Sequence, residues 1–286
     1  MRSTGDRSAW WIRRSVPALS LLFFVLLLHV GCRKVERSPQ EVRTGAFSEV
    51  FGGPNLAPKY LSPNVAYDLP PGKERYFLYV PQSYTGSEPY GLIVFTYADP
   101  RARLPFGWQG VLDTRRYIFV AAENAGNDQP RARRLGLAVM GAMKTMEAYR
   151  IDPNRVYAAG FSGGARMAGL LGFYQSDIFR GTLQNSGADF YRPVPVVEAT
   201  SLVDTAGHTY GLLQASDEDV RQAKAVRFVF ITGSNDFRRG NISDIFHGGF
   251  EPDGFKAKLF DVPGMGHDIC DRETLSRALG FLEGGS

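Results

Sequence analysis

The sequence predicts an α/β fold with a mainly parallel central sheet and helices on both of its faces. Apolar runs typical of buried strands recur along the chain, and stretches with helical periodicity lie between them. The composition agrees, since 44% of the 286 residues are hydrophobic and 22% are charged, which suits a globular protein with one large core. In such a sheet, reactive side chains gather at the carboxyl ends of the strands.

Three strands are predicted in the first half of the chain. Glu74–Val80 (E-R-Y-F-L-Y-V) is strand-like and ends at a proline. Gly91–Tyr97 (G-L-I-V-F-T-Y) is a continuous apolar run, as expected of a strand buried on both faces. Tyr117–Ala122 (Y-I-F-V-A-A) is another run of this kind.

An amphipathic helix is predicted at Arg131–Tyr149, because its apolar side chains recur at a spacing that gives one helical face. These side chains are Leu135, Ala138, Val139, Ala142, Met143 and Met146. The helix begins with three arginines, Arg131, Arg133 and Arg134. We expect a solvated basic face there, with binding of a substrate carboxylate as the alternative.

The alternation continues in the second half of the chain. Arg155–Ala159 is strand-like and Gly164–Tyr174 is helix-like. Arg227–Thr232 and Ala257–Val262 are predicted strands, and Arg272–Leu282 is a closing amphipathic helix.

The domain organisation follows from this pattern. We expect one domain over residues 66–286, with a cap-like insertion near residues 190–225, where no strong periodicity is present. Residues 32–65 are polar and punctuated by proline and glycine, which predicts a linker or tether. Residues 1–31 predict a signal peptide of the lipoprotein type.

The predicted signal peptide consists of a charged segment and an apolar one. Arg13 and Arg14 precede the apolar run Val16–Val30, which is too short to span a typical membrane as a helix. Cys32 follows in a context that resembles a bacterial lipobox, in which the cysteine carries the lipid, although His29 stands where leucine is usual. We expect a membrane-anchored lipoprotein of the bacterial cell envelope. Ordinary cleaved secretion and an uncleaved anchor are the alternatives.

The formal net charge of +4 does not indicate a nucleic-acid partner. Four of the 33 basic residues and one of the 29 acidic residues lie in residues 1–31, so 29 basic and 28 acidic residues remain. The sequence contains no common metal-ligand or phosphate-binding motif, and we expect neither a metal nor a cofactor. If Cys32 is lipidated, Cys270 is left without a partner, and we expect it to be a small buried residue.

Gly160-Phe161-Ser162-Gly163-Gly164 matches the G-x-S-x-G pattern of a nucleophile elbow. The match is informative because a predicted strand precedes it and a predicted helix follows it. The glycines allow the strained turn that presents Ser162, and the backbone N–H of Gly163 would face an oxyanion near a helix N-terminus. A glycine-rich helix start capped by Ser162 is the alternative.

A serine hydroxyl needs a base to become a nucleophile, and the base needs an orienting acid. His267 lies in a glycine-rich loop after the strand Ala257–Val262, and it is the expected base. His29 lies in the signal segment, and His208 and His247 lie in loops that no predicted strand precedes.

Asp236 is the expected acid because it closely follows the strand that ends at Thr232. Asp244 and Asp253 compete with it on the same loop, whereas Asp268 directly follows the expected base and is poorly placed to reach its ring. The chain order serine, aspartate, histidine is that of the α/β-hydrolases.

The stretch R-I-D-P-N-R-V-Y-A-A-G-F-S-G-G-A-R-M-A resembles the nucleophile segment of the polyhydroxybutyrate-depolymerase-like and feruloyl-esterase-like α/β-hydrolases. The tracts A-E-N-A-G-N and T-G-S-N-D-F-R are also similar to this family, and the likeness covers roughly residues 75–283. The resemblance implies an α/β-hydrolase fold, acylation of Ser162, His267 as the base and Asp236 as the orienting acid. It also implies an ester substrate, small or polymeric, and no cofactor.

One departure from the family concerns the turn after the third strand, where members usually carry a His-Gly pair that supplies the second oxyanion N–H. Here the strand continues as F-T-Y-A-D-P-R, so the expected donor is the backbone N–H of Tyr97 or Ala98, with the Tyr97 side chain as a candidate to assist. We expect an exported serine esterase. A peptidase of the same fold and a catalytically inactive surface binding protein are the alternatives.

Overall fold

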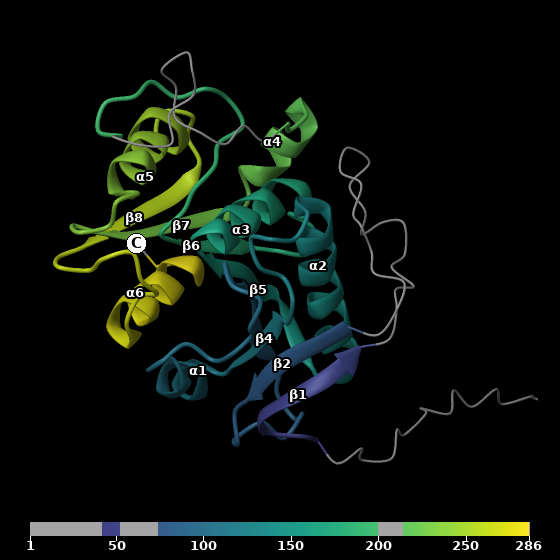
Figure 1. Cartoon of the computed structure of the whole chain (residues 1–286). Coiled ribbons are helices and arrows are strands. Elements are labelled where there is room, and N and C mark those ends of the chain that lie inside the picture. The colour runs from purple at the N-terminus through teal and green to yellow at the C-terminus, as the bar shows by residue number, and fades with distance from the viewer. Residues whose placement is uncertain (1–41, 52–73, 200–213, 286) are drawn as a thin grey trace, which may run out of the picture. The chain divides into compact units, whose positions relative to one another are not determined.

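One sheet organises the residues described by the computed structural model, which are 42–51, 74–199 and 214–285 (Figure 1). Eight strands of these residues form it in the order β1-β2-β4-β3-β5-β6-β7-β8. They are β1 (Gly45–Phe51), β2 (Glu74–Val80), β3 (Tyr90–Thr96), β4 (Tyr117–Ala122), β5 (Ile151–Phe161), β6 (Gly181–Asn185), β7 (Arg227–Gly233) and β8 (Lys256–Val262). β1 and β2 pair antiparallel, β2 and β4 do so as well, and every other pair is parallel. The predicted mainly parallel sheet is confirmed.

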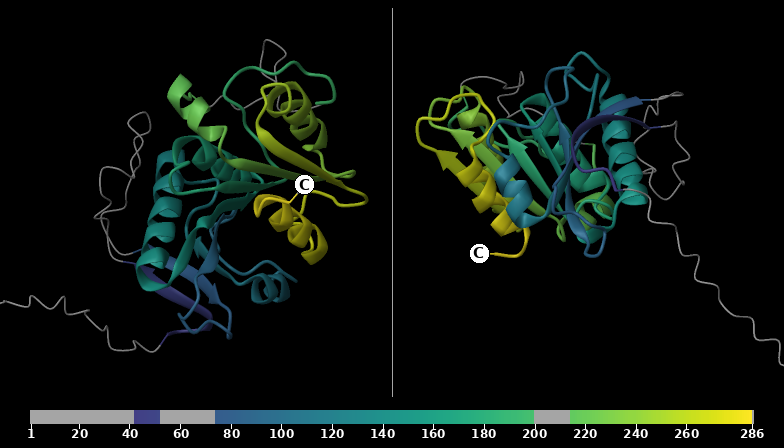
Figure 2. Two further views of the ribbon diagram at one scale, coloured as in Figure 1. Left: turned by 180° about the vertical axis from the view of Figure 1, so that it is seen from behind. Right: turned by 90° about the horizontal axis from the view of Figure 1, so that it is seen from below.

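Helices cover both faces of this sheet, as predicted. α2 and α3 lie on one face, and α1 and α6 lie side by side on the other (Figures 1 and 2). The helices of the described residues are α1 (Gln109–Arg115), α2 (Arg131–Ala148), α3 (Gly163–Tyr174), α4 (Asp217–Ala223), α5 (Arg239–Ile245) and α6 (Arg272–Leu282), with a π-helical turn η2 (Phe246–Phe250) after α5.

The alternation of side chains along each strand divides the core into two layers. Leu92 and Val94 of β3 pack toward α2 and α3, whereas Ile93 and Phe95 pack toward α1 and α6. Because both layers are apolar, β3, β4 and β6 are buried along their whole length. The carboxyl ends of the parallel strands therefore meet at one edge of a rigid sheet.

Several elements differ from the sequence-based expectations. β1 lies inside residues 32–65, so the prediction of a tether is wrong at Gly45–Phe51, where the chain forms the edge strand beside β2. Its exposed and half-buried residues alternate, which is the period of a strand. The short elements β6, α1, α4 and α5 were not predicted.

Part of the expected cap-like insertion near 190–225 is described. It contains α4, which packs beside the C-terminal end of α3, where Ser176 Oγ lies 3.4 Å from Gln222 Oε1. The predicted signal peptide with Cys32 and His29, and also His208, lie outside the described residues. Within the described ranges, no helix is both long enough and apolar enough to cross a membrane.

Candidate active site

Ser162 lies at the turn between β5 and α3, at the carboxyl edge of the sheet. Its backbone has φ of 56°, in the region that residues with side chains rarely adopt, and it occupies the N-cap position of α3. Its N–H donates to the carbonyl of Asn185 in β6 at 2.8 Å. The strained turn is thus held by the neighbouring strand, and it presents a hydroxyl at the start of a helix.

The two outer glycines of G-x-S-x-G are required by close backbone approach. A Cβ added to Gly160 would lie 2.3 Å from the carbonyl oxygen of Gly164. A Cβ added to Gly164 would lie 1.9 Å from the carbonyl oxygen of Thr96 at the end of β3. The motif therefore lets α3 begin in direct contact with the two central strands.

His267 is hydrogen-bonded to both Ser162 and Asp236. Its Nε2 lies 2.9 Å from Ser162 Oγ, and its Nδ1 lies 2.8 Å from Asp236 Oδ1. The imidazole is also flanked by two phenyl rings, with centroid distances of 5.0 Å to Phe161 and 4.4 Å to Phe237. The structure thus brings together three side chains from the loops after β5, β7 and β8.

Asp236 is a buried carboxylate with several donors. Thr232 Oγ1 donates to its Oδ2 at 3.2 Å, and the backbone N–H of Arg238 donates to its Oδ1 at 2.9 Å. Burial alone would raise the pKa of Asp236, but hydrogen bonds from His267, the Arg238 N–H and Ser186 outweigh burial and hold the pKa below its usual value. Asp236 is consequently ionised at neutral pH and can orient the His267 ring.

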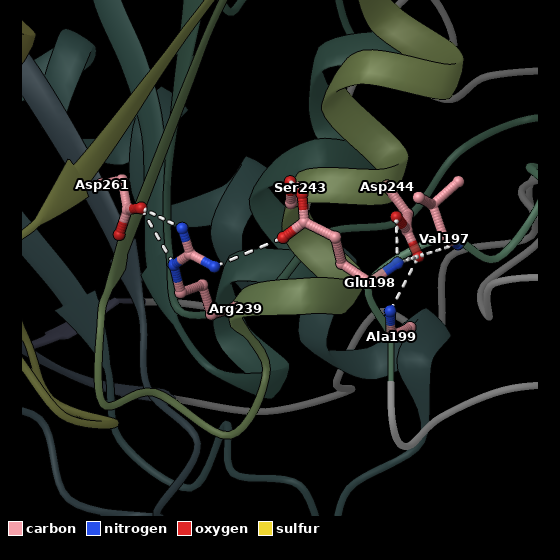
Figure 3. Close-up of polar contacts among 7 residues, drawn as sticks. All are labelled: Val197, Glu198, Ala199, Arg239, Ser243, Asp244 and Asp261. Atoms are coloured by element: carbon pink, nitrogen blue, oxygen red, sulfur yellow. Dashed lines mark hydrogen bonds and ion pairs between the residues drawn. The ribbon is translucent and has the colours of Figure 1, made fainter.

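The competing acids have other partners. Asp244 in α5 is buried and accepts the backbone N–H groups of Val197, Glu198 and Ala199, so it anchors that loop (Figure 3). Asp253 binds Tyr191 and Arg192. Asp268 accepts from the N–H of Ile269, and the exposed His247 pairs with Glu251. None of these contacts connects a competing acid to His267.

The backbone after β3 lies against the start of α3. Arg134 Nη2 donates to the carbonyl of Tyr97 at 3.1 Å. Because the C=O and N–H of a trans peptide point in opposite directions, the Ala98 N–H is directed away from Arg134. The Tyr97 side chain does not assist there, since its hydroxyl donates to the Arg103 carbonyl at 2.6 Å and its ring packs on Phe95 in the core.

Two residues of this region were not identified from the sequence. Arg134 was expected on a solvated face, but it is only 4% exposed and also donates from Nε to the Ala125 carbonyl at 2.8 Å. Asn127 lies against Gly163, where an added Cβ would meet its Oδ1 at 1.9 Å. The basic run and the tract A-E-N-A-G-N were visible signals, but their positions depend on contacts between distant segments.

A cavity of about 960 Å³ opens beside the loop that carries His267. It lies between the segment that leads into α1 and the start of α6, and Phe106 at its rim is fully exposed. Cys270 contributes to its wall and is buried, as expected. Across the described ranges, no group of three or more His, Cys, Asp or Glu side chains is placed to hold a metal ion.

The sheet order, the turn at Ser162 and the order of the three hydrogen-bonded side chains define an α/β-hydrolase fold. Comparison with solved structures agrees. A ferulic acid esterase superposes with a TM-score of 0.58 over 85% of this chain and 98% of its own, at 16% identity. The poly(3-hydroxybutyrate) depolymerase LpqC of Bordetella parapertussis superposes with a TM-score of 0.54 over 83% and 89% of the two chains, at 15% identity.

Sequence comparison points the same way over a shorter stretch. The poly(3-hydroxybutyrate) depolymerase of Ralstonia pickettii is 32% identical over an alignment of 97 residues, and the alignment covers 29% of this chain. The match spans only 20% of the length of that relative. No model of a known protein family matches the chain. The resemblance to depolymerase-like and feruloyl-esterase-like proteins is confirmed by these similarities.

Proposed function

We propose that this protein is an exported serine hydrolase that cleaves carboxylic esters through an acyl-enzyme. The observation that carries the proposal is the continuous hydrogen-bonded chain from Ser162 Oγ through His267 to Asp236. A hydroxyl, an imidazole and a buried carboxylate connected in this way form a nucleophile, a general base and an orienting acid.

In the first step, Ser162 Oγ attacks the ester carbonyl while His267 Nε2 takes its proton. The imidazolium that forms is stabilised by Asp236, whose pKa is low enough that it stays ionised. Collapse of the tetrahedral intermediate releases the alcohol, which receives the proton from His267. The acyl group then remains on Ser162.

The negative charge of that intermediate needs donors beside Ser162. The Gly163 N–H is at the N-terminus of α3, where the helix dipole favours an anion. The Ala98 N–H is the second donor in this proposal, because Arg134 fixes the peptide that carries it. Water, activated by His267, then attacks the acyl-enzyme and frees the acid.

An ester is favoured over a peptide because similar proteins are named as a ferulic acid esterase and poly(3-hydroxybutyrate) depolymerases. An inactive binding protein is disfavoured by geometry. A protein without catalytic activity has no need to keep Ser162 in a strained backbone conformation with its hydroxyl 2.9 Å from an imidazole.

A fluorophosphonate probe tests the proposal. Wild-type protein should be labelled at Ser162, and Ser162→Ala should abolish both labelling and hydrolysis of 4-nitrophenyl esters. Ser176→Ala, which removes a buried hydroxyl beyond α3, should leave both intact. Folded wild-type protein that takes up no label would contradict a hydrolase, and cleavage of peptides but not esters would favour the peptidase.

The proposed export depends on the N-terminal segment. In bacteria fed a clickable fatty acid, the full chain should take up lipid and partition with membranes, and Cys32→Ser should abolish uptake. Cys270→Ser is the matched control, since that thiol is buried in the folded domain. Membrane association without lipid uptake would instead favour an uncleaved anchor.

A further inference from the structure

One buried carboxylate next to the candidate active site interacts electrostatically with three arginines. Asp189, in the loop after β6, is only 2% exposed. Arg166 Nε donates to its Oδ1 at 2.7 Å, and Arg131 and Arg238 also act on it electrostatically. Burial raises the pKa of Asp189 to about 6 despite these arginines, so the carboxyl group is mainly ionised at pH 7.

The guanidinium of Arg238 makes no hydrogen bond or ion pair with any residue that the structure describes. Its carbon Cζ lies 5.3 Å from the centre of the Phe237 ring. Its Nε is buried and has no hydrogen-bond partner within those residues. A buried donor without a partner costs free energy, so this position favours an acceptor from outside the chain.

The charges of the cluster do not balance. Two carboxylates, Asp189 and Asp236, stand against the three guanidinium groups of Arg131, Arg166 and Arg238, and both carboxylates attract Arg238. Burial and then the charge of Arg166 lower the pKa of Arg238. Since like charges repel, one further anion would balance the remaining positive charge and stabilise this arrangement.

The cluster is close to the reacting atoms. Arg166 follows Ser162 by about one turn of α3. Arg238 donates its backbone N–H to the same Asp236 oxygen that His267 contacts, and it neighbours Phe237, whose ring packs on His267. An anionic group held between Arg166 and Arg238 would therefore belong to a molecule that reaches Ser162.

We propose that Arg166 and Arg238 bind a free carboxylate of the substrate, so that the preferred esters are anionic, such as monoesters of short dicarboxylic acids. The inference rests on the proposed ester hydrolysis and adds the substrate class to it. The planar guanidinium group suits a carboxylate, because it offers paired N–H donors to two oxygens. Phe237, which is 59% exposed, offers an apolar surface to the chain between carboxylate and ester.

The test compares two esters of equal carbon number, the mono-4-nitrophenyl ester of glutaric acid and 4-nitrophenyl valerate. Wild-type protein should prefer the anionic ester in kcat/KM. Arg238→Gln should lower the ratio of kcat/KM, anionic over neutral, by roughly tenfold or more, the effect of one charge-assisted hydrogen bond. Arg166→Gln is less informative, since it would leave Asp189 buried without its closest partner.

Arg239→Gln is the matched control. It removes the same charge one residue further along, but Arg239 is exposed to solvent in part and pairs with Asp261 and Glu198 (Figure 3). The ratio should therefore stay at the wild-type value. Raising the ionic strength should lower the ratio in the wild type more than in Arg238→Gln.

The outcomes separate this inference from the proposed function. If both esters are cleaved and Arg238→Gln leaves the ratio of kcat/KM unchanged, the proposed carboxylate site is wrong, but the proposed ester hydrolysis is supported. If neither ester is cleaved and no fluorophosphonate label is taken up, the hydrolase is wrong. Titration calorimetry with glutarate then tests the carboxylate site by itself. Binding to wild type that Arg238→Gln abolishes would support the site, and the absence of binding to wild type would overturn it.

Discussion

At the scale of single residues, two adjacent glycines are needed for different reasons. An added Cβ on Gly164 would meet a backbone carbonyl of β3, whereas one on Gly163 would meet the end of the Asn127 side chain. Backbone in a central strand cannot move cheaply, but a side-chain amide can rotate. The cost of a methyl group should therefore differ strongly between the two positions.

Gly164→Ala should lower the free energy of unfolding by about 3 kcal/mol or prevent folding, and Gly163→Ala should cost less than about 1 kcal/mol. Urea unfolding measures both. The loss of unfolding free energy caused by Gly163→Ala should be smaller still in a protein that also carries Asn127→Ala, because the clashing side chain is gone. Equal losses of unfolding free energy in Gly163→Ala and Gly164→Ala would contradict the contacts with Thr96 and Asn127.

Asp236 links stability to pH. Its pKa is lower in the folded protein than in the unfolded chain, so its ionised form stabilises the fold above the unfolded pKa of about 3.9. That contribution is lost as the pH falls through the folded value. Asp236→Asn should have a lower free energy of unfolding than wild type at pH 7. The difference between the two proteins should be smaller at pH 3.

Urea unfolding at both pH values checks this expectation, and a constant gap would contradict it. Under the proposed mechanism the same variant should also lose kcat on the order of 10³-fold, because His267 loses the carboxylate that orients it. Asp244→Asn gives a comparison, since that carboxylate anchors a loop instead.

At the scale of elements, α2 contacts the candidate active site through the side chain of Arg134. This helix lies against β3 and β4, and its first turn places a buried guanidinium on the carbonyls of Ala125 and Tyr97. Burial, followed by the charge of Arg166, lowers the pKa of Arg134 to about 10, so it stays charged at neutral pH. Arg134 acts as a positioning residue for the Tyr97–Ala98 peptide.

Under the proposed mechanism, Arg134→Met should lower kcat for a neutral ester by roughly tenfold or more, with KM within about twofold, because the Ala98 N–H acts on the oxyanion in the transition state. Arg133→Met is the control, because Arg133 pairs with Glu74 instead. Steady-state kinetics distinguish the two. A loss of stability without a change in kcat would show that Arg134 only supports the fold.

The elements also show what the sequence could predict. β3 and β4 could be predicted because nearly all of their residues are apolar, which is the composition of a strand buried along its whole length. β6 is equally buried, yet Thr182, Gln184 and Asn185 give it a polar composition. Gln184 donates to Thr182 within the strand, and Asn185 accepts the N–H of Cys270 from a distant loop, a contact that the sequence does not reveal. Short helices such as α1 contain too few turns for a periodic signal.

The candidate site was predictable to a similar degree. Ser162, Asp236 and His267 each follow a recognisable strand, so the topology alone brings them to one edge. Arg134 and Asn127 could not be assigned in this way. Their positions depend on how α2 and the loop after β4 pack against α3, and sequence periodicity does not encode such contacts.

At the scale of the whole molecule, β1 extends the domain beyond the boundary expected at residue 66. It pairs with β2 along all seven of its residues, and Phe51 packs on Tyr76 with a ring distance of 4.7 Å. Without β1, the hydrogen-bonding edge of β2 would be open to solvent and to other chains.

A chain shortened to begin at residue 66 should consequently melt at least about 5 °C lower than one that begins at residue 42. It should also elute partly as larger species in size-exclusion chromatography, because an open strand edge invites pairing. Calorimetry on the two shortened chains provides the comparison. Identical melting temperatures would show that β1 contributes little to the domain.

The bond between Ser162 and His267 joins residues 105 positions apart. A ribosome that adds about 5–20 residues per second leaves a nascent chain with its serine but without its base for roughly 5–20 s. During that interval the proposed chemistry has no proton acceptor. Under the proposed mechanism, the chain therefore gains ester hydrolysis only after translation has passed β8 and that strand has paired with β7.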